Sequence, residues 1–150
     1  MAKTTTPFAG TGNLPDMGWY DGNSGGHIIH RAIPLASQQS VENEFGLHRD
    51  AGWAGGSTQP VGQKAPNGFG LYDMHGNVVE WCEDVWDAVY YSKPEARGPD
   101  PVATSGADAR DVRGGSRGDQ AWNCRSARRG WSLHLDRDYN LGFRPAAPVP

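Results

Sequence analysis

The stretch Asn67-Gly-Phe-Gly-Leu-Tyr-Asp-Met-His-Gly-Asn-Val-Val-Glu-Trp-Cys-Glu-Asp84 carries most of the structural information in the chain. It combines glycine-punctuated turns, acidic residues at short spacing and many aromatic side chains. Its first part is typical of an irregular loop, because glycine permits backbone conformations that other residues avoid. From Val78 to Val85 the residues become apolar and β-branched, which predicts a short strand.

The composition of the chain predicts a single loop-rich domain. The 150 residues include 21 Gly and 11 Pro, too many for a helical bundle, without the period of a collagen. Six Trp, five Tyr and four Phe supply apolar area for a core, and a chain of this length buries roughly 70% of its unfolded surface. We therefore expect one α+β domain over residues 1–150, dominated by loops and held by a few short strands.

Charge, hydropathy and cysteine content exclude several classes of protein. The formal net charge of −3 argues against a dedicated nucleic-acid binder. We find no run of about 18 apolar residues and no basic-then-apolar N-terminus, so neither a membrane span nor a signal peptide is predicted. Cys82 and Cys124 allow at most one disulfide, and the sequence leaves open whether they meet. A cytoplasmic protein without a membrane partner is the expected class.

Glycine and proline punctuate the rest of the chain. Residues 35–48 are the best helix candidate, because Ser37 or Ser40 could cap an imperfect apolar stripe. The other expected segments are loops over 1–26 and 50–69, a surface excursion over 92–109, and short strands at 111–113 and 141–144.

Four motifs, taken in order, resemble one protein family. They are the stretch 67–84, Arg113-Gly-Gly-Ser116, Cys124-Arg-Ser-Ala127 and Leu141-Gly-Phe-Arg144. Together they resemble the C-terminal part of the formylglycine-generating-enzyme (sulfatase-modifying factor) domain. The resemblance implies a C-type-lectin-like fold that is N-terminally truncated relative to the family domain. A missing edge strand would leave backbone groups unpaired, so we expect marginal stability alone or a second chain that completes the domain.

The loop from Asp73 to Glu80 has two interpretations. Its two carboxylates lie on either side of Gly76. They could belong to a solvated acidic loop with Glu80 in an ion pair, or they could hold calcium, which takes six to eight oxygen ligands in flexible geometry. In the resembling family the matching motif binds calcium. The resemblance therefore implies a structural Ca²⁺ held by the side chains of Asp73 and Glu80 and the carbonyl groups of Gly76 and Val78.

The segment after Ser116 bears on catalysis. A catalytic member of the resembling family carries two cysteines there, because thiolate is both the Cu(I) ligand and the nucleophile. Here residues 117–123 contain no cysteine, and Cys124 falls in a scaffold motif. We therefore assign no catalytic residue and expect a domain without this chemistry. Two alternatives stay open: an oxidase that converts a sulfatase cysteine to formylglycine, and one part of a related iron oxygenase.

The spacings between Ser116 and Cys124 and between Ala127 and Leu141 resemble a non-catalytic branch, the variable proteins of diversity-generating retroelements. In that branch the intervening positions bind ligands, and Trp, Tyr and Arg dominate binding hot spots. The sequence does not say whether these positions are diversified here or serve one fixed ligand. The resemblance implies a ligand-binding face for a protein, peptide or small molecule, made of Arg117, Asp119, Gln120, Trp122, Arg128, Arg129, Trp131, His134, Arg137 and Tyr139, with Leu133 and Asp138 between them.

The same region is rich in arginine. Arg125, Arg128, Arg129 and Arg137 could recognise carboxylate or phosphate groups through bidentate hydrogen bonds. They could equally pair internally with Asp119, Asp136 and Asp138. The sequence leaves both possibilities open.

Overall fold

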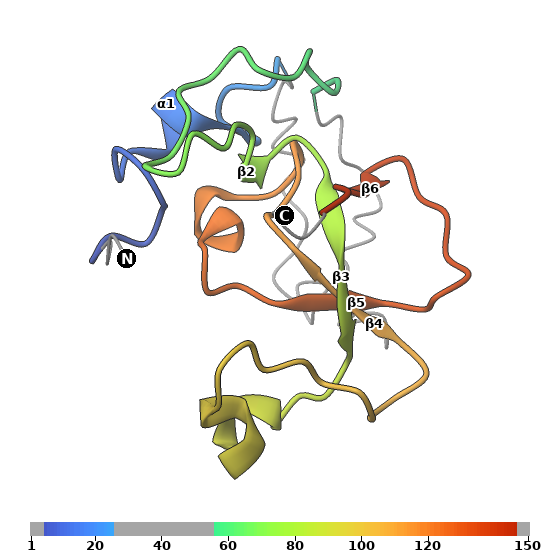
Figure 1. Ribbon diagram of the computed structural model, residues 1–150. Helices are drawn as coiled ribbons and strands as arrows, with labels where there is room; N and C mark the ends of the chain where they lie inside the picture. Colours follow the sequence, from blue (N-terminus) through green and yellow to red (C-terminus); the bar gives the residue numbers. More distant parts are fainter. Residues whose placement is uncertain (1–4, 26–55, 147–150) are drawn as a thin grey trace, which may run out of the picture.

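The computed structural model of the chain describes residues 5–25 and 56–146 (Figure 1). The expected helix at 35–48 lies outside these residues. The described part contains one short helix, three 3-10 helices and six short strands. In order they are α1 (Leu14–Met17), β1 (Gly18–Trp19), β2 (His75–Gly76), β3 (Val79–Val85), η2 (Tyr90–Ser92), η3 (Pro94–Arg97), β4 (Arg110–Arg113), η4 (Ala121–Cys124), β5 (Gly130–Ser132) and β6 (Leu141–Gly142).

A four-stranded sheet in the order β5-β4-β3-β6 forms the centre of the molecule. β4 runs antiparallel to both of its neighbours, with Trp81 opposite Val112 in the β3–β4 pair. The last strand, β6, joins β3 in parallel, with Leu141 opposite Val79. A separate parallel pair of β1 and β2 lies beside this sheet and ties the N-terminal segment to the loop before β3.

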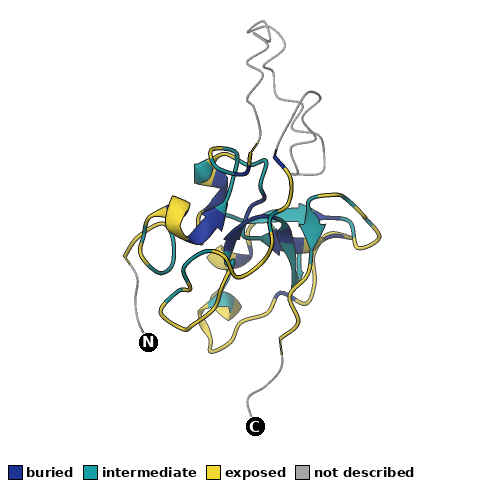
Figure 2. Cartoon of the chain, turned by 90° about the horizontal axis from the view of Figure 1, so that it is seen from above, coloured by how far each residue is buried: buried dark blue, intermediate teal, exposed yellow. Residues whose placement is uncertain are grey.

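The alternation of side chains along β3 gives the sheet two different faces. Val79 and Trp81 share one face, which also carries Val112 of β4, and both valines are buried. Glu80 lies on the other face, opposite Arg113, and the register with β4 shifts between Trp81 and Val85. Figure 2 shows the buried residues concentrated at the strands and the exposed residues on the surrounding loops. The buried apolar side chains are Leu14, Met17, Val79, Tyr90, Ala103, Ala109, Val112 and Cys124.

Left-handed backbone shapes the loop that leads into β3. Asp73, Gly76 and Asn77 have φ angles of 54°, 73° and 66°. At Gly76 a side chain is also excluded by space, because a Cβ atom there would lie 2.0 Å from the carbonyl oxygen of Trp19. Asn77 accepts a hydrogen bond from the backbone N–H of Gln59 and donates one to its carbonyl oxygen, at 2.9 and 3.0 Å. The glycine-punctuated loop predicted from the sequence is therefore confirmed.

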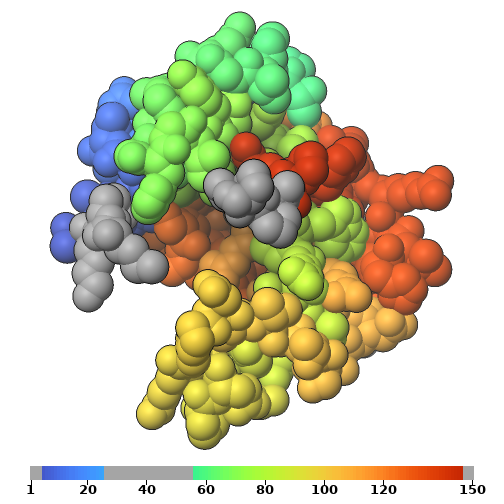
Figure 3. All heavy atoms as spheres, viewed as in Figure 1, coloured from blue at the N-terminus to red at the C-terminus, as the bar shows by residue number. Residues whose placement is uncertain are grey.

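Residues 92–109 form a surface excursion, as predicted, and the segment projects from one edge of the molecule (yellow to orange in Figure 3). Two buried alanines anchor it. The carbonyl oxygen of Ala103 accepts a hydrogen bond from the N–H of Val85, and the N–H of Ala103 donates to the carboxylate of Asp84. The N–H of Trp86 donates to the carbonyl oxygen of Ala109.

The strands expected at 78–85 and 111–113 are present as β3 and β4. The strand expected at 141–144 is shorter, because β6 ends at Gly142. β5 was not predicted, and the segment 1–26, expected to be loop, contains α1 and β1. Both cysteines are free. Within the described residues, no helix has the length and apolar character needed to cross a membrane.

Candidate functional site

The loop from Asp73 to Glu80 is closed by an arginine from the end of β6. The guanidinium of Arg144 donates two hydrogen bonds of 2.8 Å to the carboxylate of Glu80. It also donates to the carbonyl oxygen of Asp73 at 3.0 Å. One guanidinium therefore contacts both ends of the loop. Glu80 forms an ion pair, as one of the two interpretations of the sequence expected.

One carboxylate oxygen in this loop is left without a hydrogen-bond partner among the described residues. Oδ1 of Asp73 is buried and has no hydrogen-bond partner, whereas Oδ2 accepts a 2.6 Å hydrogen bond from the N–H of Gly62. An unsatisfied buried carboxylate oxygen is costly unless a donor or a cation meets it. Among the described residues no three His, Cys, Asp or Glu side chains converge as a metal site. Calcium here would therefore rely on Asp73, on Glu80 shared with Arg144, and on backbone carbonyl groups such as those of Gly76 and Val78.

The turn after β4 is organised by an aspartate. Oδ2 of Asp119 accepts hydrogen bonds of 2.7 Å from both the backbone N–H and the hydroxyl group of Ser116. Oδ1 of Asp119 accepts a longer one, of 3.4 Å, from the side chain of Asn123. Asp119, expected on the ligand-binding face, therefore uses both carboxylate oxygens within its own turn.

Cys124 is a core residue. Its relative exposure is 0%. Burial, with smaller contributions from the charges of Asp119 and Asp21, raises the pKa of its thiol to about 12. A thiol with this pKa has almost no thiolate at neutral pH, and thiolate is the reactive form. Burial also raises the pKa of the free thiol of Cys82.

His75 in β2 contacts two distant segments of the chain, one at Phe8 and Ala9 and the other at Cys124. Nδ1 lies 2.7 Å from the carbonyl oxygen of Cys124, and Nε2 accepts a 3.0 Å hydrogen bond from the backbone N–H of Ala9. Phe8 packs edge-on against the imidazole ring, with 5.7 Å between the ring centroids. These contacts fit the neutral tautomer with its proton on Nδ1, and burial lowers the pKa of His75.

The residues expected to bind a ligand fall into separate groups. Arg117 stacks on Tyr139, with its guanidinium carbon 5.0 Å from the ring centroid. Gln120 accepts a 2.6 Å hydrogen bond from the indole N–H of Trp122. Tyr139 and Trp122 remain 69% and 49% exposed, so both present aromatic surface to solvent.

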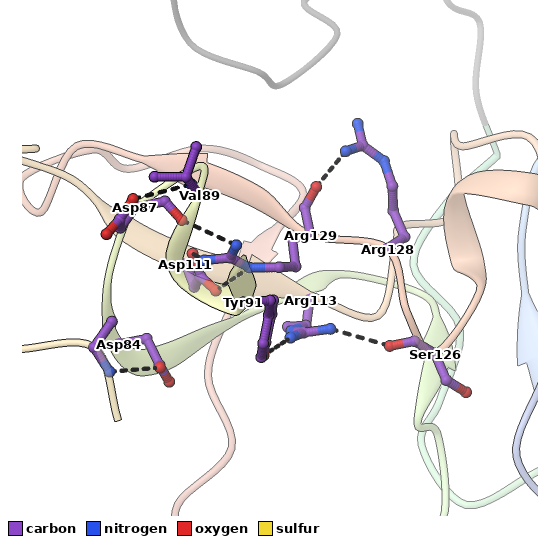
Figure 4. Close-up of polar contacts among 10 residues, drawn as sticks. Asp84, Asp87, Val89, Tyr91, Asp111, Arg113, Ser126, Arg128 and Arg129 are labelled. Atoms are coloured by element: carbon purple, nitrogen blue, oxygen red, sulfur yellow. Dashed lines mark hydrogen bonds and ion pairs between the residues drawn. The ribbon is translucent and has the colours of Figure 1, made fainter. Parts of the chain in front are cut away.

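Arg129 is held by an aspartate and by two aromatic rings, and Figure 4 shows its contact with Asp111. Two hydrogen bonds of 2.8 and 2.9 Å join its guanidinium to the carboxylate of Asp111, whose side chain is only 2% exposed. The guanidinium carbon lies 4.7 Å from the ring centroid of Trp86 and 4.9 Å from that of Tyr91. Arg129, the residue before β5, thereby joins β4 to the segment 86–91 that follows β3.

The loop 133–138 is set apart from η4. In Figure 1 it reaches one edge of the molecule, whereas η4 lies toward the opposite edge. His134 contacts the carboxylate of Asp108 at 3.0 Å, and Asp136 accepts hydrogen bonds from Ser132 and the N–H of Leu133. Arg137 is exposed, and Trp131 lies in β5 opposite Asp111. The expected face is therefore not one continuous patch.

The sequence did not identify Trp86, Tyr91 and Asp111 as partners of Arg129. Trp86 and Tyr91 follow β3 in a stretch without a recognisable motif, so their approach to Arg129 depends on the tertiary fold. Asp111 carried no clear signal either, because it lies in β4 between Arg110 and Val112, in a strand where most residues are charged.

Comparison with known proteins places these features in a family. The family described as "Sulfatase-modifying factor enzyme 1-like domain" matches residues 26–148. The formylglycine-generating enzyme of Streptomyces coelicolor is 40% identical over 93 residues, which cover 60% of this chain and 29% of that protein. The corresponding enzyme of Thermomonospora curvata is 45% identical over 60 residues, covering 39% of this chain and 20% of that protein. The chain thus spans less than a third of these relatives.

Two solved structures resemble the chain over most of its length. Treponema denticola variable protein 1 superposes with a TM-score of 0.62 and 28% identity, covering 93% of this chain and 40% of the other. PvdO from Pseudomonas aeruginosa has a TM-score of 0.56 and 24% identity, covering 91% and 42%, which indicates a shared fold. The family match, the two enzymes and the variable protein agree with the four sequence motifs, and the chain therefore belongs to the sulfatase-modifying factor enzyme 1-like (formylglycine-generating-enzyme) domain family.

Proposed function

We propose that this chain is a non-catalytic, ligand-binding member of its family, built on a C-type-lectin-like fold. The observation that carries the proposal is the state of Cys124. Residues 117–123, where the resembling enzymes carry a reactive pair, contain no cysteine, and Cys124, which follows them in a scaffold motif, is fully buried with a thiol pKa of about 12. A buried, protonated thiol supplies neither the Cu(I) ligand nor the nucleophile that cysteine oxidation requires.

The loops after β4 and β5 support ligand binding in place of that chemistry. Trp122 and Tyr139 expose aromatic surface, and each is held by a neighbour, Gln120 for Trp122 and Arg117 for Tyr139. Exposed aromatic rings that are already held in place lose little conformational entropy when a partner binds. The likeness to a variable protein supports the same assignment.

We also propose that the loop from Asp73 to Glu80 takes a structural calcium ion. Asp73 supplies its unpartnered Oδ1, and Glu80 supplies its carboxylate beside Arg144. When bound, the ion neutralises charge and fixes the loop before β3. This role concerns the scaffold, because the loop is separate in sequence from the binding residues at 117–139.

The second candidate is the oxidase activity of the family. It is favoured by the identity of 40% and 45% to two formylglycine-generating enzymes. In this candidate Cys82 or Cys124 would have to become accessible and ionised, so it requires a rearrangement around β3 or η4.

Two measurements on the same folded sample test these functions. In the first, the chain is incubated with oxygen, Cu(I), reductant, calcium and a Cys-x-Pro-x-Arg peptide, and the peptide mass is followed. We expect no conversion of cysteine to formylglycine, and conversion overturns the proposal. In the second, a random peptide library is selected on the chain. Binders that are lost with Trp122→Ala or Tyr139→Ala, but kept with the exposed control Tyr72→Ala, support the binding face. A selection that yields no such binders contradicts it.

A further inference from the structure

Three arginine side chains are anchored on one short segment, Trp122–Ser126. Nε of Arg125 donates to the carbonyl oxygen of Trp122 at 2.8 Å, and Nε of Arg128 donates to the side-chain oxygen of Asn123 at 3.1 Å. From β4, Arg113 donates to the carbonyl oxygen of Ser126 at 3.1 Å. Three positive charges are therefore gathered around five consecutive residues.

Among residues 5–25 and 56–146, no carboxylate forms an ion pair with these three arginines. The ion pairs found in the described residues are Lys93–Asp87, Arg129–Asp111, His134–Asp108 and Arg144–Glu80. The partners of Arg113, Arg125 and Arg128 are carbonyl, amide and phenol oxygens, which carry no net charge. The aspartates at 136 and 138 accept hydrogen bonds within their own loop, and Asp119 does so within its turn. Internal pairing is one of the two possibilities for this basic cluster, and within the part of the chain that the structure describes it applies only to Arg129, whose partner is Asp111.

The unpaired guanidinium groups keep donors free for a ligand. Among the described residues, Arg125 makes a hydrogen bond only through Nε, so both of its terminal NH₂ groups are available in the planar arrangement that matches a carboxylate. In Figure 4 the side chain of Arg113 reaches toward Ser126, whereas that of Arg128 points away from Ser126, toward the carbonyl oxygen of Arg129. This divergence suits an extended ligand with several acidic groups better than a single small anion. Trp122, whose carbonyl oxygen anchors Arg125, also exposes its ring to solvent and can add apolar contact.

We propose that Arg113, Arg125 and Arg128, with Trp122, form a docking site for an acidic polypeptide segment. This inference rests on the proposed binding function and adds the chemical class of its ligand. A peptide is favoured over nucleic acid, because the chain has a net charge of −3 and a long polyanion would also meet its other acidic surfaces. An acidic peptide needs only a local positive surface and an aromatic contact.

Fluorescence anisotropy with a labelled oligoglutamate peptide tests the site. An oligoglutamine peptide of the same length and a single-stranded oligonucleotide of the same charge serve as competing ligands. We expect oligoglutamate to bind more tightly than both, with an affinity that falls as salt rises. Arg125→Gln and Arg128→Gln should each weaken binding roughly tenfold. Arg97→Gln, which removes the same charge from the exposed helix η3, should leave it unchanged. Thermal melting of each variant shows whether it is folded.

The possible outcomes separate this inference from the function on which it rests. Peptides selected from the random library that depend on Trp122 but carry no excess of Asp or Glu would keep the binding function and overturn the acidic ligand. Equal loss of oligoglutamate binding with Arg97→Gln overturns the site, as does tighter binding of the oligonucleotide. A library selection without any binder that depends on Trp122 removes the proposed function itself.

Discussion

Arg144, two residues after β6, and Glu80, the second residue of β3, are joined by two hydrogen bonds with N···O distances of 2.8 Å. The same guanidinium reaches the carbonyl oxygen of Asp73. The pair therefore closes the loop for which the family resemblance implies calcium, and Oδ1 of Asp73 in that loop is buried without a hydrogen-bond partner among the described residues. A bound cation would satisfy this oxygen.

Calcium should raise the stability of the chain. An ion that binds only the folded state at 100 times its dissociation constant adds about 2.7 kcal/mol to the free energy of unfolding. Glu80→Gln should remove most of this increment, because the carboxylate is both a predicted calcium ligand and the partner of Arg144. Urea denaturation with calcium and with chelator measures the effect, and Glu83→Gln on the exposed part of β3 is the control. Identical curves with calcium and chelator for the unmodified chain contradict the calcium site.

Arg129 and Asp111 should behave as a buried ion pair. Arg129→Leu leaves the carboxylate of Asp111 without its partner in a position that is 2% exposed. Removing one member of a buried pair typically lowers stability by about 3–5 kcal/mol. Urea denaturation should show this loss of stability for Arg129→Leu. Arg110→Leu, at an exposed position beside Asp111 in β4, should change the stability little. The double variant Arg129→Leu with Asp111→Leu should recover part of the loss, and a double variant as unstable as the single one refutes the pairing argument.

The parts of the fold that depend on local residue pattern were predictable. The β-branched run at 78–85 and the residues 111–113 became β3 and β4, and the glycine loop before β3 is present with Gly76 and Asn77 in left-handed conformations. β5 escaped prediction because Gly130-Trp-Ser132 is too short to show alternation. It exists because β4 offers it a partner, with Asp111 opposite Trp131.

The residue types of the candidate site were predictable from the sequence, whereas the spatial arrangement of these residues was not. The spacing of the motifs singled out Trp122 and Tyr139, and both are exposed. The same argument placed Arg129 on the ligand face, but its partner Asp111 belongs to a different strand, and pairing between strands has no signature in either segment alone. The separation of the loop 133–138 from η4 likewise follows from the position of β5 between them.

Acid should destabilise the chain through His75. Its pKa is lowered in the folded state by burial, so the unfolded chain binds a proton more readily. The stabilising contribution is complete above the unfolded pKa of about 6.5. It is lost progressively as pH falls from there toward the lower folded pKa, because a proton on Nε2 faces the N–H of Ala9. The urea midpoint should decrease as the pH is lowered across this range. His75→Gln should flatten this dependence of the midpoint on pH, whereas His134→Gln, at an exposed position, should leave it unchanged. An unchanged slope in His75→Gln excludes this origin.

Alanine substitutions at Gly70 and Gly76, which have nearly the same φ angle, can distinguish the cost of left-handed backbone from the cost of a steric clash. Gly76 has a φ of 73° and Gly70 a φ of 76°. An alanine at either position bears the strain of left-handed backbone, about 1–2 kcal/mol. At Gly70 the added Cβ meets no atom within 4 Å, whereas at Gly76 it lies 2.0 Å from the carbonyl oxygen of Trp19. Gly76→Ala must therefore also push β1 away from β2.

Urea denaturation should show only the strain for Gly70→Ala and a clearly larger loss, or no cooperative transition, for Gly76→Ala. Equal losses would mean that the contact between β1 and β2 adds little to stability. A larger loss at Gly76 would instead mean that the close approach of β1 and β2 helps to hold the N-terminal segment and the loop before β3 in place, because no other pair of strands in the described ranges joins them.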